Sequence, residues 1–210
     1  MGIPDITSII LAGGSSSRFG DNKALQAVGG RSLVQLVVDR LAILGSEIIV
    51  ATADGQGIPC SSAVPIKTVA DIHPGKGALV GIHSGLTASS SSSAIVVACD
   101  MPFLNVGLLR YMVEARGGCD VAVPRIGRMV EPLCAIYSRD CLVPIRRLLQ
   151  QNELRILKLF SMVDVRYIEE DEIDRFDPEH LSFFNVNTPA DLETATKLAA
   201  EKGSIVPDNS

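Results

Sequence analysis

Residues 11–23 read Leu11-Ala12-Gly13-Gly14-Ser15-Ser16-Ser17-Arg18-Phe19-Gly20-Asp21-Asn22-Lys23, and they decide how the rest of the chain is interpreted. The apolar run before them, residues 6–11, predicts a buried first strand, and a helical pattern begins after them near Ser32. Glycines let a backbone approach phosphate closely, and Arg18 and Lys23 add positive charge to the same loop. The stretch therefore predicts a nucleoside triphosphate site at the end of the first strand.

The loop differs from two better-known phosphate loops. The dinucleotide fingerprint needs the spacing Gly-x-Gly-x-x-Gly, which Gly13, Gly14 and Gly20 do not have. The P-loop needs a lysine directly after its last glycine, whereas Asp and Asn stand between Gly20 and Lys23. The sequence therefore excludes both of these classes of site.

Composition narrows the class of protein. A chain of 210 residues can bury one full core, so we expect a single domain over residues 1–203 and a frayed tail over residues 204–210. The net charge of −5 and the lack of a basic block argue against a nucleic-acid partner. The N-terminus shows no signal-peptide pattern, and no apolar run is long enough for a membrane span. An odd number of cysteines without a Cys-x-x-Cys pair indicates free thiols, so we expect a soluble cytoplasmic protein.

Strand and helix patterns alternate along the chain. The sequence predicts strands over residues 6–11, 47–51, 64–70, 94–99, 120–124, 134–137 and 162–168. It predicts helices that follow Ser32 and Thr188 as caps, and others over residues 78–87, 106–115, 141–151 and 155–160. The serine run, residues 89–93, is interpreted as a flexible surface connection, and residues 183–187 as a short extended piece. This alternation predicts an open, three-layer α/β/α Rossmann-like fold with a mostly parallel sheet.

Four polar groups fall at the ends of predicted strands, where an open α/β sheet binds its ligands. They are the loop from Gly13 to Lys23, Asp71, Asp100, and the pair Glu131-Pro132. A carboxylate at Asp100 would either cap the following helix or hold Mg²⁺, which favours hard oxygen ligands. Asp71 would either start a turn or contact the ligand.

The loop also resembles the signature Leu-Ala-Gly-Gly-x-Ser-x-Arg-Met-Gly-x-Asp-Lys of the molybdenum cofactor guanylyltransferase family. These are nucleotidyltransferases with a Rossmann domain similar to that of nucleotide-diphospho-sugar transferases. The chain departs from the signature at Phe19, where the family has Met, and at Asn22, where it has Asp. The matching residues are Leu11, Ala12, Gly13, Gly14, Ser16, Arg18, Gly20 and Lys23.

Later segments are similar to the same family, and the resemblance implies a role for each. Cys-Asp-Met-Pro-Phe at residues 99–103 resembles the family's metal-binding segment and implies Mg²⁺ on Asp100. The resemblance implies that Arg18, Lys23 and Asp100 are catalytic. It implies nucleotide contacts from Leu11, Ala12, Gly13, Gly14, Lys23, Asp71 and Asp100, and acceptor contacts from Glu131, Pro132, Asn185 and Asn187.

The activity implied by the resemblance is transfer of GMP from GTP to molybdopterin, with Mg²⁺ and release of pyrophosphate. Partners would be these two small molecules, with no nucleic acid or membrane, and with room for transient contact with molybdoenzyme maturation factors. A cytidylyltransferase for the same pterin and a guanylyltransferase for another phosphorylated metabolite stay open. An inactive nucleotide-binding regulator is the alternative from another class; Asn22 favours it, and retention of Lys23 and Asp100 opposes it.

Overall fold

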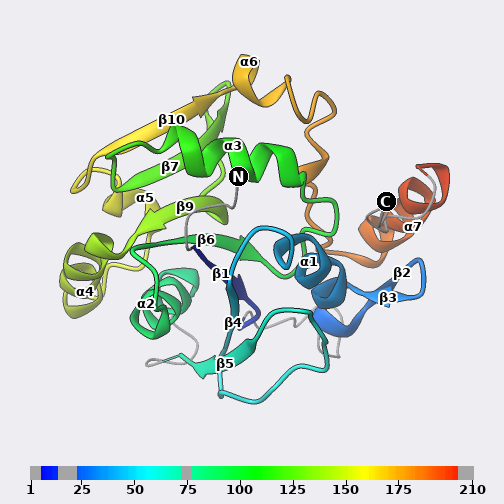
Figure 1. The fold of residues 1–210 in the computed structure, drawn as a ribbon, viewed down its shortest axis with the longest axis horizontal. Coiled ribbons are helices and arrows are strands. Elements are labelled where there is room, and N and C mark those ends of the chain that lie inside the picture. Colours follow the sequence, from blue (N-terminus) through cyan, green and yellow to red (C-terminus); the bar gives the residue numbers. More distant parts are fainter. Residues whose placement is uncertain (1–5, 14–22, 72–76, 203–210) are drawn as a thin grey trace.

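A computed structural model describes residues 6–13, 23–71 and 77–202, and a mixed sheet runs through its centre (Figure 1). Within those residues the sheet holds eight strands in the order β10-β7-β9-β6-β1-β4-β5, with β8 paired to β7. The strands are β1 (Thr7–Leu11), β4 (Glu47–Thr52), β5 (Ile66–Ala70), β6 (Ser93–Ala98), β7 (Val121–Ile126), β8 (Met129–Val130), β9 (Cys134–Ser138) and β10 (Val165–Glu169). A separate hairpin pairs β2 (Ala27–Val28) with β3 (Arg31–Ser32).

Most neighbouring strands are parallel, as predicted. β1 lies between β4 and β6 and runs parallel to both, so that Ile9 is opposite Ile49 and Val96. β5 continues the parallel set beyond β4, and β10 is parallel to β7. β9 runs antiparallel to both β6 and β7, and the short β8 is also antiparallel to β7. This reversal brings the start of β9 to the edge at which β1, β4 and β6 end.

Helices cover both faces of the sheet and complete the three layers. α1 (Leu33–Leu41) and α3 (Val106–Ala115) pack on the face that carries Ile10, while α2 (Ala78–Ala88) and α4 (Leu142–Gln150) pack on the face that carries Ile9. Alternate β1 side chains enter opposite cores because successive residues of a strand point to opposite faces. Short helices α5 (Ile156–Leu159) and α6 (Glu170–Ile173) lie in the second half of the chain.

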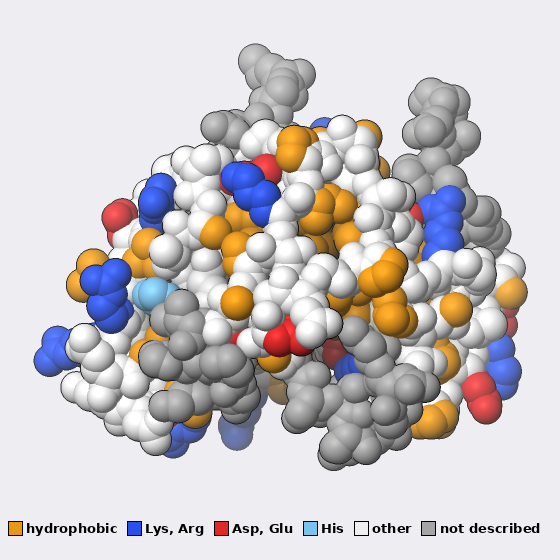
Figure 2. Space-filling view, turned by 90° about the horizontal axis from the view of Figure 1, so that it is seen from below, with side chains coloured by type: hydrophobic (Ala, Val, Ile, Leu, Met, Phe, Trp, Pro, Cys, Tyr) orange, Lys and Arg blue, Asp and Glu red, His pale blue; other side chains and the backbone are white. Residues whose placement is uncertain are grey.

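The last helix, α7 (Pro189–Glu201), packs outside these layers beside α1 and the β2–β3 hairpin (Figure 1). Its start confirms the predicted cap: the Thr188 hydroxyl accepts from the backbone N–H of Asp191, whose carboxylate accepts from the Thr188 N–H. Ser32 likewise caps α1 by accepting from the backbone N–H of Gln35. No helix among the described residues is long and apolar enough to cross a bilayer. Lys and Arg side chains stand mainly around the rim of the face in Figure 2, not in one basic patch.

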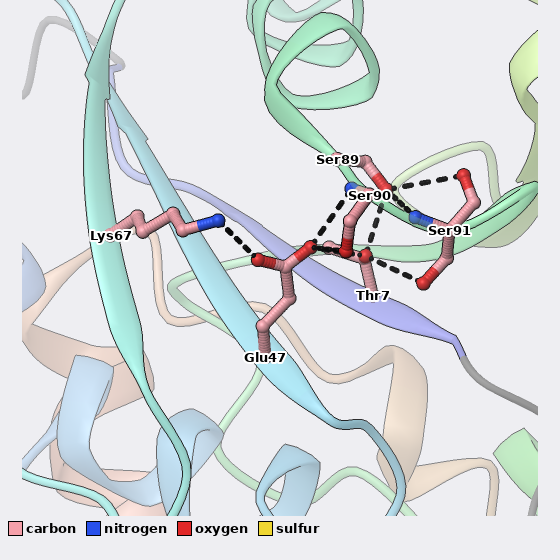
Figure 3. Close-up of polar contacts among 6 residues, drawn as sticks. All are labelled: Thr7, Glu47, Lys67, Ser89, Ser90 and Ser91. Carbon is pink, nitrogen blue, oxygen red and sulfur yellow. Dashed lines mark hydrogen bonds and ion pairs between the residues drawn. The ribbon is translucent and has the colours of Figure 1, made fainter.

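The serine run is not the flexible surface connection that the sequence predicted. Ser89 and Ser91 are buried at 3% and 4% exposure, between the end of α2 and the start of β6. Figure 3 shows their hydroxyls and that of Ser90 gathered around Thr7 and the carboxylate of Glu47. Serine hydroxyls that bind neighbouring groups can be buried in a fixed conformation, which composition alone does not reveal.

Two other expectations concern residues 183–187 and the extent of the domain. The extended piece predicted over residues 183–187 is wrong at its start, because a 3₁₀ turn over Leu181–Phe183 begins it. The buried Asp177 carboxylate accepts from the backbone N–H groups of Leu181 and Ser182, which favours a turn over an extended strand. The predicted tail, residues 204–210, lies outside the described residues, and the single domain over residues 1–203 stays a prediction.

Candidate functional site

Three chain segments leave the sheet side by side at the ends of β1, β4 and β6. The backbone N–H of Ala12 donates to the carbonyl of Ala51 at 2.8 Å. The backbone N–H of Cys99 donates to the carbonyl of Leu11 at 3.1 Å. The N–H of Asp71 donates to Thr52 at 2.9 Å, so the end of β5 joins the same edge. The sheet therefore brings together the residues predicted at strand ends.

Lys23 and Asp100 meet at this edge, as the sequence reasoning required. Lys23 begins a 3₁₀ turn, Lys23–Leu25, and its Nζ lies 2.5 Å from Oδ2 of Asp100. The same Nζ donates to Oδ1 of Asn187 at 2.7 Å. The side chains of Lys23 and Asp100 are 18% and 16% exposed, so the ion pair is largely shielded from solvent. The three residues form one cluster although they come from distant parts of the chain.

The cap of α7 holds Asn187 in this cluster. The Asp191 carboxylate accepts from the backbone N–H of Asn187 at 2.9 Å, and this hydrogen bond chiefly lowers the pKa of Asp191. The N–H of Val186 donates to the backbone carbonyl of Asp100 at 3.0 Å, which ties the segment before α7 to the end of β6. The structure thus places Asn187, predicted to contact the acceptor, against Lys23 and Asp100. Asn185 instead donates its side-chain amide to the carbonyl of Phe183.

Asp100 does not cap the helix that follows it. Asn105 is the cap of α3, because its Oδ1 accepts from the N–H of Leu108 at 2.9 Å. The capping alternative for Asp100 is therefore wrong. Among the described residues, Oδ1 of Asp100 is buried without a hydrogen-bond partner, while Oδ2 receives Lys23.

These oxygens fit a hard divalent cation. Mg²⁺ usually takes one or two protein carboxylates and fills its remaining positions with phosphate oxygens and water. Asp100 supplies a carboxylate with one unpartnered oxygen, and Asn187 supplies a neighbouring amide oxygen. The part of the chain that the structure describes holds no cluster of three His, Cys, Asp or Glu side chains.

Asp71 lies beside the first glycine of the loop. A Cβ placed on Gly13 would lie 3.1 Å from Oδ2 of Asp71, and one on Gly81 would lie 3.5 Å from Oδ1. The two glycines therefore leave space for the carboxylate between β1 and α2. Burial raises the pKa of Asp71, and its Oδ1 is buried without a hydrogen-bond partner among the described residues.

Glu131 and Pro132 reach the same edge because β9 is reversed. Burial raises the pKa of Glu131, and the nearby negative charge of Asp100 raises it further. The hydroxyl of the buried Tyr137 donates to the carbonyl of Pro132 at 2.8 Å and fixes this loop. Gly14 and Arg18, the other predicted loop contacts, lie outside the described residues.

A cavity of about 680 Å³ opens beside Pro132. Ala78 and Ile156 contribute apolar wall, and Arg155 and Lys158 contribute the cationic groups of its lining. Residues 154–161 were not predicted as part of a site, since their periodicity indicated only a helix. Two cations within a short apolar segment were the available signal.

Comparisons with known proteins agree with this geometry. Residues 8–165 match the family model described as a MobA-like NTP transferase domain. A probable molybdenum cofactor guanylyltransferase of Pelotomaculum thermopropionicum is 37% identical, with 92% of this chain and 93% of the relative covered. A molybdenum cofactor guanylyltransferase of Desulfosudis oleivorans is also 37% identical, with 95% and 98% covered.

Solved structures show the same fold. Molybdopterin-guanine dinucleotide biosynthesis protein A of Archaeoglobus fulgidus superposes with a TM-score of 0.79 at 26% identity, covering 93% of this chain and 100% of that one. The 2-C-methyl-D-erythritol 4-phosphate cytidylyltransferase of Thermus thermophilus has a TM-score of 0.69 at 20% identity, with 95% and 100% covered, and shares the fold alone. The predicted fold class and the predicted resemblance are confirmed. The chain belongs to the MobA-like NTP transferase family.

Proposed function

We propose that this chain transfers GMP from GTP to molybdopterin and releases pyrophosphate. One observation carries the proposal: Lys23 and Asp100 form a shielded ion pair 2.5 Å long at the edge where the glycine loop leaves β1. The names of the relatives, which cover nearly the whole chain, support guanylyl transfer to the molybdenum cofactor. Magnesium, GTP and a cytoplasmic location belong to the same proposal, the last because the five cysteines are free thiols.

The reaction needs charge stabilisation more than a general base. A phosphate monoester has its second pKa near ~6, so the acceptor phosphate is already a dianion at neutral pH and can attack the α-phosphorus. The protein must hold two polyanions together and neutralise the charge on the departing pyrophosphate. Lys23, Arg18 and the backbone N–H groups of the loop supply positive charge and hydrogen bonds to the triphosphate. Bound Mg²⁺, held by Asp100, would add positive charge beside the phosphates.

The carboxylate of Asp71 favours recognition of guanine over cytosine as the base of the nucleotide. The N1 and N2 edge of guanine offers two donors to one carboxylate, and cytosine has no matching pair. The Asp71 carboxylate is half-buried beside Gly13 and keeps an oxygen without a partner among the described residues. A base held next to the loop could donate its N–H groups to this oxygen.

The cavity beside Pro132 supports a flat acceptor that carries a phosphate. Its lining is mostly apolar, which suits a ring system, and Lys158 suits an anionic group, whereas the Arg155 guanidinium is paired with Glu153. Glu131 directly precedes Pro132, which lines the cavity, and burial and the charge of Asp100 raise the pKa of Glu131. We therefore assign the acceptor to this side of the site.

Pyrophosphate release with Mg²⁺ and each nucleoside triphosphate, with and without molybdopterin, tests the proposal. We expect release with GTP that depends on molybdopterin. Lys23→Ala and Asp100→Ala should each lower turnover by a factor on the order of 10²–10³, while Lys202→Ala, which changes an exposed lysine just after α7, should leave it unchanged. Far-UV circular dichroism checks that each variant is folded.

The outcomes separate the alternatives. Release with CTP in place of GTP would indicate the cytidylyltransferase, and release that needs a different acceptor would indicate the other guanylyltransferase. No release with any triphosphate, together with a melting point that GTP raises, would indicate the binding regulator. Near wild-type turnover of Lys23→Ala or Asp100→Ala would refute the role assigned to that residue.

A further inference from the structure

The Lys23 ammonium lies between two oxygens of the kind that a divalent cation prefers. Its Nζ is 2.5 Å from Oδ2 of Asp100 and 2.7 Å from Oδ1 of Asn187. Carboxylate and amide oxygens are both hard ligands for Mg²⁺. The ammonium therefore occupies a position between two oxygens that could coordinate a metal.

The backbones of Asp100 and Asn187 are fixed by hydrogen bonds, whereas Lys23 has a long side chain that can change its partner. The carbonyl of Asp100 accepts from the N–H of Val186, and the N–H of Asn187 is held by Asp191. Asp100 and Asn187 are thus positioned by the end of β6 and by the cap of α7. Lys23 reaches them through a four-carbon side chain with several rotatable bonds. A change of partner would involve Lys23 rather than the two oxygens.

We propose that Lys23 occupies the cation position between Asp100 and Asn187 when no nucleotide is bound, and that a triphosphate draws it away so that the metal can enter. The inference rests on the proposed function, because it needs a triphosphate to be the ligand of Lys23. It also makes Asn187 a metal ligand of this chain rather than a contact of the acceptor. Metal binding would then depend on nucleotide.

Electrostatics gives the direction of the effect. An ammonium and a divalent cation on the same carboxylate repel each other strongly in a shielded site. The polyanionic triphosphate offers the ammonium other oxygens, and Lys is a mobile point charge for phosphate. Without nucleotide, the ion pair with Asp100 should therefore weaken metal binding.

One competing arrangement is visible in the structure. Oδ1 of Asp100 has no hydrogen-bond partner among the described residues, so a cation could bind there while Lys23 stays on Oδ2. In that arrangement Asn187 would not touch the metal. The contribution of Asn187 to metal affinity therefore distinguishes the two arrangements.

Mn²⁺ binding to the full chain without nucleotide, measured by electron paramagnetic resonance, tests the proposal. Lys23→Met should bind Mn²⁺ about tenfold more tightly than wild type, because the competing charge is gone. Adding Asn187→Ala to Lys23→Met should weaken binding about tenfold, as expected for loss of a ligand. Lys202→Met is the matched control: this lysine pairs with Glu179 beyond the end of α7, and its loss should change nothing.

The α,β-methylene analogue of GTP provides the second arm. It should tighten Mn²⁺ binding more in wild type than in Lys23→Met, since only the wild type must first release the lysine. Circular dichroism and melting points check folding, and Lys23→Gln replaces Lys23→Met if that variant does not fold. Equal or weaker Mn²⁺ binding by the Lys23 variant would overturn the proposal. So would an Asn187→Ala change without effect in the Lys23→Met background.

Failure of this proposal and failure of the proposed function give different results. If wild type transfers GMP but Mn²⁺ affinity ignores Lys23, the competition is wrong and the function stands. If no triphosphate is consumed, the proposed function is wrong, and Mn²⁺ titrations without nucleotide still report whether Lys23 competes with the metal.

Discussion

Glu47→Gln should destabilise the fold without touching the chemistry. Glu47 begins β4 at the edge opposite the candidate site, and it is 6% exposed. Its Oε1 accepts from Thr7 at 2.8 Å and from both the N–H and the hydroxyl of Ser90, at 3.0 and 2.7 Å (Figure 3). Its Oε2 accepts from Lys67 at 2.7 Å. A glutamine can keep one set of these bonds but turns an amide N–H₂ toward the other donors.

The magnitude follows from these contacts. Burial alone would raise the pKa of Glu47, but the hydrogen bonds from Lys67, Ser90 and Thr7 outweigh it and lower the pKa to about 2. At 1.36 kcal/mol per pKa unit, lowering it from the reference of 4.5 corresponds to an upper bound of about 3 kcal/mol. The Lys67 side chain is 53% exposed, so solvent screening weakens its ion pair with Glu47. The expected loss in the free energy of unfolding is therefore about 1–2 kcal/mol. For a chain of this length that is a fall in melting point of about 2–8 °C.

The pH dependence has a definite sign. The pKa of folded Glu47 is below that of the unfolded chain, so the carboxylate stabilises the fold fully above pH 4.5. This contribution is lost as the pH falls from 4.5 toward about 2. Glu47→Gln should therefore show a shallower loss of stability over that range than wild type.

Urea unfolding between pH 7 and pH 3, followed by circular dichroism, measures the effect. Lys67→Met is the matched control and should cost less than about 1 kcal/mol, because its ammonium is exposed. Pyrophosphate release per folded molecule should stay at the wild-type value for both variants. The reasoning is refuted if Glu47→Gln unfolds at the wild-type urea concentration at pH 7, or if its stability falls as steeply in acid as that of wild type.

Three further predictions concern packing and the site. Gly85→Ala should cost about 1–3 kcal/mol in urea unfolding, because its Cβ would lie 2.5 Å from Cγ2 of Ile9; a variant as stable as wild type would contradict this close packing. Thr188→Ala removes the hydroxyl that caps α7 and should cost about 1 kcal/mol, with unchanged stability as the contrary result. Gly13→Ala should raise the KM for GTP about tenfold, because its Cβ would press on Oδ2 of Asp71 at 3.1 Å, and an unchanged KM would argue that Asp71 is not part of the nucleotide site.

Residue patterns predicted the structure correctly in segments whose own sequence determines their structure. The apolar run at residues 94–99 predicted a buried strand, and β6 occupies Ser93–Ala98 with every residue buried. The Thr-Pro-x-Asp start of α7 predicted a capped helix, and the capping box is present. Both signals are local. A strand that is buried on both faces needs apolar side chains, and the unpaired N–H groups at the start of a helix need hydrogen-bond acceptors.

Tertiary partners could not be predicted in the same way. The serine run was interpreted as a surface connection because nothing in residues 89–93 shows that Glu47 lies beside them. The ammonium of Lys23 was expected near Asp100, and Asn187 was expected to face the acceptor, because the resemblance assigned those roles separately. A lysine that bridges both oxygens is a property of three segments packed together, and no one segment carries it.

The antiparallel strand β9 explains how one edge of the sheet can serve two substrates. If β9 were parallel to β6, the residues before it, Glu131 and Pro132, would lie at the amino-terminal edge, near the Glu47 cluster. Its reversal moves them to the edge of Asp100, whose charge raises the pKa of Glu131. The parallel strands then contribute Ala12, Gly13 and Asp71 to this edge, while the reversed strand contributes Glu131 and Pro132. A transfer reaction needs room for two substrates, and this strand order brings residues of the parallel strands and of the reversed strand to one edge.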